Sequence, residues 1–141
     1  MHRSGKRPWD TVVICEGEKD CEAVMALSLW TVDGGELIAT TSGGANSWQD
    51  QFADELCGKR IVVMPDNDEA GALYADHIIA SLLRRGIEHR VVSFGDGGAK
   101  DVSQFLEDGG SRDQLMTRMG ADWVAESDPT TVERPSVFER A

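Results

Sequence analysis

Two short acidic clusters, each placed directly after an apolar run, constrain most what this chain can fold into. The apolar residues 12–15 lead into a cluster over residues 16–20, and the apolar residues 61–64 lead, through a proline, into a second cluster over residues 66–69. Runs that are apolar throughout are typical of parallel strands covered on both faces. Because the carboxyl ends of parallel strands share one edge of the sheet, we expect the two clusters to face each other there. Gathered carboxylates repel one another, so the pattern predicts a divalent metal site that serves a phosphate substrate.

Strand and helix patterns alternate four times along the 141 residues. Strands are expected over residues 11–15, 37–41, 60–64 and 89–94, and helices over residues 20–30, 47–57, 69–85, 100–109 and 111–119. This alternation predicts an α/β fold with a parallel sheet of about four strands, flanked by helices and joined by right-handed crossovers. Residues 1–9 are expected to form a flexible arm, residues 10–120 the domain, and residues 121–141 a tail or linker.

Charge and composition exclude several classes of protein. The net charge is −11 at pH 7, which argues against a chain that grips nucleic acid by itself through phosphate neutralisation. The three cysteines form no CxxC pair, which argues against a zinc ribbon or a disulfide framework. No apolar run has the length of a membrane span, and no signal peptide is recognisable, so we expect a cytoplasmic protein without a membrane partner.

Carboxylates at the two expected strand ends are the main candidate site residues. Asp66 and Asp68 are two residues apart and point the same way from a strand, so both can reach one cation or bridge two. Glu16 ends the first strand and can bind metal or act as a general acid or base. Asp20 can reach back from the first turn of the following helix. The alternative for each cluster is that its acids only cap the next helix.

Further candidates follow the other two strands. The pair Lys100 and Asp101 lies after the fourth strand, where Asp101 can add a ligand and Lys100 a phosphate contact. Gly43 and Gly44 follow the second strand and can expose backbone N–H groups to phosphate before a helix. Lys19 is another candidate phosphate contact. The alternative is a solvated loop or an exposed helix start in each case.

The motifs EGEKD at residues 16–20, DNDEAG at residues 66–71 and KD at residues 100–101 together resemble the Toprim domain. That domain is shared by bacterial-type primases, type IA and II topoisomerases, and OLD-family and ribosomal-RNA maturation nucleases. The DNDEAG form with a later KD is similar to primases, and with EGEKD it is similar to the primase part of phage and plasmid helicase-primases. The resemblance covers about residues 10–110 and implies a Toprim fold, which is Rossmann-like.

By this resemblance, the catalytic and metal-binding residues would be Glu16, Asp66 and Asp68, and the metal would be Mg²⁺ or Mn²⁺. The supporting residues would be Asp20, Asp101 and Lys100. The sequence departs from the pattern at one position, because bacterial primases often carry a second acid two residues after the KD aspartate, where this chain has Ser103.

The resemblance implies an enzyme module that transfers nucleotidyl or phosphodiester groups in DNA replication, as part of a primase or helicase-primase. Nucleoside triphosphates and a DNA template would be its substrates, and a helicase or a basic template-binding domain its partner. Three alternatives stay open: a small Toprim nuclease, a non-catalytic module that binds metal and nucleotide, and a phosphoreceiver domain with Asp66 as the phosphorylated residue. A phosphoreceiver would carry its paired acids after the first strand, where this chain has EGxxD.

Overall fold

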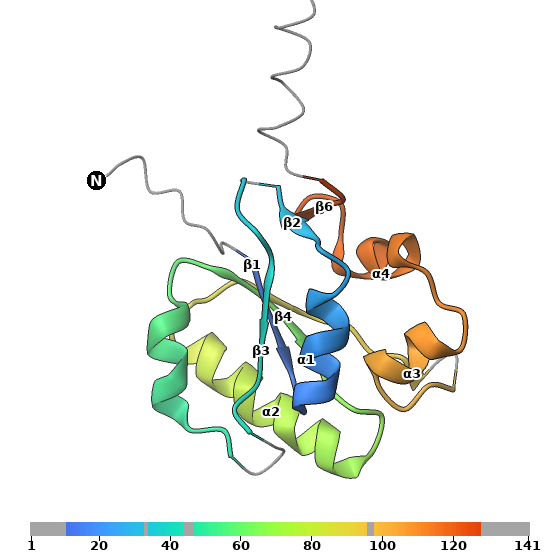
Figure 1. Cartoon of the computed structure of the whole chain (residues 1–141). Coiled ribbons are helices and arrows are strands. Elements are labelled where there is room, and N and C mark those ends of the chain that lie inside the picture. The colour runs from blue at the N-terminus through green and yellow to red at the C-terminus, as the bar shows by residue number, and fades with distance from the viewer. Residues whose placement is uncertain (1–10, 33, 44–46, 96–97, 128–141) are drawn as a thin grey trace, which may run out of the picture.

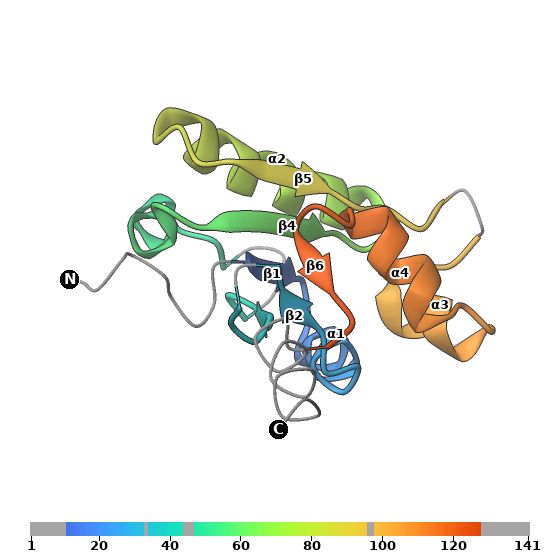
Figure 2. The same ribbon diagram turned by 90° about the horizontal axis from the view of Figure 1, so that it is seen from above.

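The computed structural model describes residues 11–32, 34–43, 47–95 and 98–127 of the chain. Its centre is a four-stranded, fully parallel sheet in the order β3-β1-β4-β5. The strands are β1 (Thr11–Cys15), β3 (Ile38–Thr40), β4 (Arg60–Met64) and β5 (His89–Val91). Helices cover both faces of the sheet, as Figures 1 and 2 show. The expected α/β fold with a four-stranded parallel sheet is therefore confirmed.

Alternate residues of the central strands supply the two halves of the core. Val12 and Ile14 face helix α2 (Glu69–Arg84) and the 3₁₀ helix η1 (Asp50–Leu56), together with Ile61 and Val63 of β4. The residues between them, such as Val13 and Val62, face the opposite layer. Because side chains alternate between the two faces of a strand, a run that is apolar throughout can fill both halves.

The opposite layer consists of three α-helices. They are α1 (Glu18–Met25), α3 (Val102–Glu107) and α4 (Arg112–Met119). The N-terminus of α4 carries a complete capping box, in which Ser111 and Gln114 exchange side chain to backbone hydrogen bonds, as the sequence predicts. Among the described residues, no helix combines the length and the apolar character that a membrane span requires.

A second, two-stranded sheet was not expected from the sequence. Strand β2 (Trp30–Thr31) pairs antiparallel with β6 (Val124–Ala125), so the helix expected over residues 20–30 ends at Met25 instead. Arg112 holds this region together, because its guanidinium donates to the carbonyl oxygens of Leu27 at 2.9 Å and Ser28 at 3.1 Å. The described elements thus extend beyond residue 120, at which the sequence places the end of the domain.

Helix α4, which follows α3, is part of the core. Shortening one of its buried side chains should therefore destabilise the whole domain. Leu115 of α4 is completely buried, whereas Leu83 of α2 is 65% exposed. Leu115→Ala should lower the free energy of unfolding by about 2–5 kcal/mol through lost burial and a residual cavity. Leu83→Ala, the matched control, should change it by less than about 0.5 kcal/mol. Urea denaturation of the two variants measures both values, and equal stability would show that α4 does not contribute to the core.

Candidate metal centre

The paired ends of β1 and β4 bring the two acidic clusters together. The two strands are in parallel register, with Cys15 opposite Met64, so Glu16 and Asp66 each follow shortly after a paired strand residue. The loop after β4 also contacts the loop before α3, because the backbone N–H of Asn67 donates to the carbonyl oxygen of Lys100 at 2.6 Å. Three segments that are far apart in the sequence therefore meet at one edge of the sheet.

Three carboxylates converge at this edge. Asp20, Asp66 and Asp101 each offer an oxygen, and these three oxygens lie within 4.8 Å of one another. The sequence ranked Asp66 as a main metal residue and the other two as supporting residues. In the structure, Asp20 in the first turn of α1 and Asp101 at the start of α3 approach Asp66 as a group.

Two carboxylate oxygens at this edge are buried without a hydrogen-bond partner among the described residues. They are Oε1 of Glu16 and Oδ1 of Asp66. Burial of an unpaired carboxylate oxygen is costly, since no water or donor replaces the lost hydration. Both oxygens therefore lack a hydrogen-bond donor at the point where the acids gather.

The electrostatic consequence is strongest at Asp66. Burial raises the pKa of the Asp66 carboxyl to about 7, and the negative charges of Glu16 and Asp20 act in the same direction. Burial also raises the pKa of Glu16, and the nearby Asp68 charge adds to this, while a hydrogen bond with the Asp66 backbone lowers it. At neutral pH the metal-free site thus resists full ionisation.

Asp68, which the sequence ranked as a catalytic and metal residue, caps helix α2. Its Oδ1 accepts a hydrogen bond from the backbone N–H of Gly71 at 2.7 Å, in an extended N-cap conformation. Its charge still influences Glu16, but it is not a member of the group of three converging carboxylates. Asp68 thus caps α2, as the capping alternative states, and its charge also acts on the site.

Ser103 supports Asp20 from the position at which the primase pattern has an acid. The Oγ of Ser103 donates to Oδ1 of Asp20 at 2.6 Å, and its backbone N–H donates to the same oxygen at 3.2 Å. Asp20 is only 5% exposed. Sequence reasoning treated this serine as a missing ligand, and only the contact between α1 and α3 shows that it holds a carboxylate in place.

Gly71 explains the glycine of the DNDEAG motif. A Cβ atom at this position would lie 2.0 Å from the carbonyl oxygen of Asp66, a distance that no side chain can occupy. The first turn of α2 therefore approaches the Asp66 backbone closely only because residue 71 is glycine. The motif sets the position of Asp66 as well as its charge.

The residues predicted to contact phosphate have fewer observed links to the site than the carboxylates have. The Lys100 charge favours the ionised form of Glu16 and so acts at this edge. Lys19 forms an exposed ion pair with Glu107 of α3 at 3.7 Å. Gly43 has a φ of +104°, and its N–H donates to Oγ1 of Thr41 at 3.2 Å. Gly44 lies outside the described residues. Phosphate binding by these residues stays a prediction.

The donor set fits a hard divalent cation. Mg²⁺ and Mn²⁺ prefer carboxylate oxygens and bind through a few protein ligands. Asp20, Asp66 and Asp101 supply three such groups, and Oδ1 of Asp66 is a buried oxygen that a cation would satisfy. The residues present at this edge can therefore hold one.

A comparison with known protein families identifies the same region. The model of a family described as Toprim-like matches residues 13–106 of the chain. This match runs from within β1 to within α3 and contains every carboxylate of the candidate site. No curated protein gives a significant match to the chain.

The raised pKa of Asp66 predicts a pH-dependent stability in the absence of metal. The unfolded carboxyl ionises near pH 4, and the folded one near pH 7. The folded state therefore binds more protons in this window, and the free energy of unfolding falls as pH rises from about 4 to about 7. Asp66→Asn should abolish this loss. Relative to the wild type, its free energy of unfolding should therefore be about 1–3 kcal/mol higher at pH 8 than at pH 4. This range is smaller than the pKa shift alone would give, because Asp66 is partly exposed to solvent.

Thermal melts in EDTA across this pH range measure the effect of Asp66→Asn. Asp76→Asn, which removes an exposed carboxylate from the surface of α2, is the control for the change in net charge. A constant difference between Asp66→Asn and the wild type at every pH would contradict the burial of Asp66 among like charges.

The capping role of Asp68 predicts a different pattern. Asn caps helices about as well as Asp, whereas Ala does not. In EDTA at pH 7, Asp68→Ala should unfold more easily than Asp68→Asn by about 0.5–2 kcal/mol. Asp68→Asn should be at least as stable as the wild type, because it keeps the cap and removes one charge. Equal stability of the two variants in urea would show that the hydrogen bond to Gly71 contributes nothing.

Proposed function

Because this chain belongs to the Toprim-like family, we propose that it is the primase part of a primase or helicase-primase, transferring nucleotidyl groups in DNA replication. The family carries the coarser conclusion of a metal-dependent module that processes nucleic acid. One observation supports the active form of that module: Asp20, Asp66 and Asp101 converge where Oδ1 of Asp66 lacks a partner. The motifs DNDEAG and KD support the primase rather than the topoisomerase branch.

The residues of the site would have different roles. Asp20, Asp66 and Asp101 would hold Mg²⁺ or Mn²⁺, which would stabilise charge on the reacting phosphate and lower the pKa of an attacking oxygen. Glu16, whose pKa is raised by burial, suits a group that accepts a proton from the attacking hydroxyl near neutral pH. Lys100 would contact the phosphates from the same edge.

A nucleic acid template would need a second domain or chain to hold it. Ion pairs already engage Lys19, Arg84, Arg85, Arg90 and Arg112. The net charge of −11 opposes further phosphate contacts. A helicase or a basic template-binding domain would supply the missing positive surface. The metal centre itself would contact only the reacting end of the strand.

Metal binding should stabilise the protein through the carboxylates that converge. A ligand that binds only the folded state at 100 times its dissociation constant adds about 2.7 kcal/mol to the free energy of unfolding. Millimolar Mn²⁺ or Mg²⁺ should therefore raise the melting temperature of the wild type. The rise should be smaller in Asp66→Asn and Asp101→Asn and undiminished in the control Asp76→Asn. Melts that do not respond to either metal would exclude a working site under those conditions.

Activity assays separate the primase from the nuclease that shares its chemistry. The protein is incubated with Mn²⁺, labelled nucleoside triphosphates and single-stranded DNA, and the products are separated by length. Short labelled oligonucleotides that disappear in Asp66→Asn support the proposal. Shortened DNA without such synthesis would identify a nuclease, in which water replaces the 3′-hydroxyl as the attacking group. Metal binding with neither product would identify a non-catalytic module.

Binding of DNA by this chain alone should be weak. We expect no tight complex with short single strands at moderate salt in EDTA, because phosphate neutralisation supplies most non-specific affinity and this surface is acidic. Fluorescence anisotropy measures this directly. Tight binding in EDTA would show that the net negative charge does not control the affinity of this chain for DNA.

A further inference from the structure

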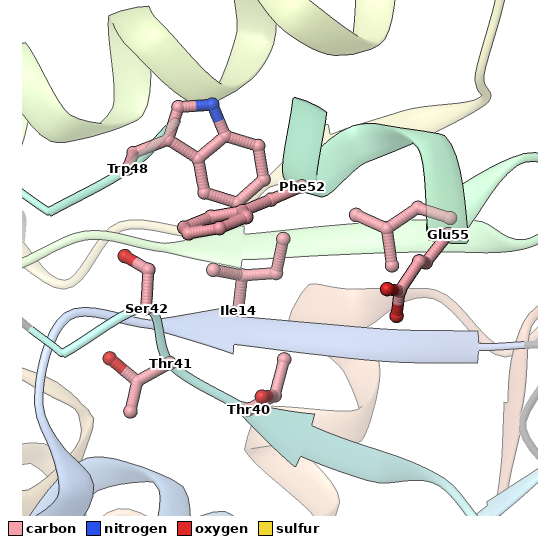
Figure 3. Close-up of a pocket in the computed structure, with 8 residues that line it drawn as sticks. Ile14, Thr40, Thr41, Ser42, Trp48, Phe52 and Glu55 are labelled. Atoms are coloured by element: carbon pink, nitrogen blue, oxygen red, sulfur yellow. The ribbon is translucent and has the colours of Figure 1, made fainter. Parts of the chain in front are cut away.

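A cavity of about 340 Å³ lies between β3, which is an edge strand of the sheet, and the segment that carries Trp48 and Phe52. Figure 3 shows its two walls. Trp48 and Phe52 lie on one side, Thr41 and Ser42 lie on the other, and Glu55 lies at the end away from Ser42. Its volume is in the range of small-molecule sites, and its lining combines aromatic rings with a few polar groups, as such sites do.

The aromatic wall is fixed in position. The indole Nε1 of Trp48 donates to Oγ of Ser81 at 3.0 Å, and Ser81 is only 1% exposed. The Phe52 ring meets the Trp48 ring edge to face, with the two centroids 5.5 Å apart. Phe52 is nevertheless 37% exposed, so part of an ordered aromatic surface stays open to solvent.

The polar wall connects the cavity to the metal centre. Oγ1 of Thr41 donates to the carbonyl oxygen of Glu16 at 2.8 Å. The Ser42 hydroxyl lies 2.9 Å from the Tyr74 hydroxyl, which in turn donates to the carbonyl oxygen of Cys15 at 3.2 Å. The Ser42 end of the cavity is therefore tied to the end of β1, where the first site acid begins.

We propose that this cavity binds the base of a mononucleotide whose phosphates lie at the carboxylate edge; the phosphate end of this assignment rests on the proposed function. A nucleobase has flat apolar faces that stack on aromatic rings such as Phe52, and polar edges that meet hydroxyl groups. Glu55, at the far end, is a hydrogen-bond acceptor that matches an exocyclic amino group, as found in adenine, cytosine and guanine. Uracil and thymine lack that group. The volume suits the base of one nucleotide rather than an extended strand.

The experiment uses adenosine, which has no phosphate and so probes the cavity without metal. Adenosine is titrated in EDTA into ¹⁵N-labelled protein, and the resonances of the Trp48 indole and of the Thr41 and Ser42 amides are followed. We expect these resonances to shift together, with uridine binding more weakly than adenosine. Phe52→Leu, which keeps an apolar side chain but removes the ring, should weaken adenosine binding at least about fivefold. Glu55→Gln should reduce the preference for adenosine over uridine.

Leu83→Ala is the matched control, since Leu83 is an exposed apolar residue of α2 that does not line the cavity, and its affinity for adenosine should equal that of the wild type. Shifts that avoid the cavity, or unchanged affinity in Phe52→Leu, would overturn the assignment. The assignment would also be overturned if the protein bound a single-stranded tetranucleotide but not adenosine. A Mn²⁺ titration of the same sample keeps the two claims separate: metal binding without adenosine binding refutes the base site alone, and adenosine binding without metal binding refutes the proposed function alone.

Discussion

Repulsion among carboxylates at the shared end of β1 and β4 is the constraint on which the rest of this structure depends. The parallel register of the two strands brings Glu16 and Asp66 to one edge, and α1 and α3 add Asp20 and Asp101. Two buried oxygens remain without partners there, and the pKa of Asp66 rises to about 7. Such an arrangement costs folding stability, so a site that binds a cation is the best physical reason for it.

The surrounding residues hold this unfavourable arrangement in place. Gly71 admits the first turn of α2 against the Asp66 backbone, and Asp68 caps that turn. Ser103 fixes Asp20 with two hydrogen bonds to one oxygen. The acids therefore differ in role. Asp68 is satisfied by its helix, whereas Asp66 keeps an oxygen that nothing in the described protein neutralises.

Local sequence patterns predict much of this fold, and they fail where long-range contacts decide. Strands β1 and β4 match their expected bounds, because their apolar runs are long and end at the acidic clusters. The pairing of β2 with β6 is invisible in sequence, since strands of two residues show no periodicity and their partners lie at opposite ends of the domain. The segment with Trp48 and Phe52 at helical spacing forms a 3₁₀ helix only from Asp50.

The candidate site also depends both on local sequence patterns and on long-range packing. Strand-end reasoning named Glu16, Asp66 and Asp68 as metal residues, and this stays a prediction. The structure groups Asp66 with Asp20 and Asp101. The sequence alone does not show this grouping, because the distances between these oxygens depend on how α1 and α3 pack. The aromatic wall of the cavity was also missed. Trp48 donates to Ser81 of α2 and lines the same cavity as Thr40 and Thr41, and scattered tryptophans in a sequence give no sign of this.

A divalent cation that binds at the carboxylate edge should displace the proton that Asp66 holds below pH 7. Calorimetric titration with Mn²⁺ at pH 6, repeated in buffers of different ionisation enthalpy, counts the protons released on binding. Since Asp66 is mostly protonated at pH 6 and ionised at pH 8, about one proton should leave at pH 6 and far fewer at pH 8. Asp66→Asn should abolish this difference and weaken binding. Binding that releases no protons at pH 6, or that is equally strong in Asp66→Asn, would show that Asp66 does not exchange its proton for the cation.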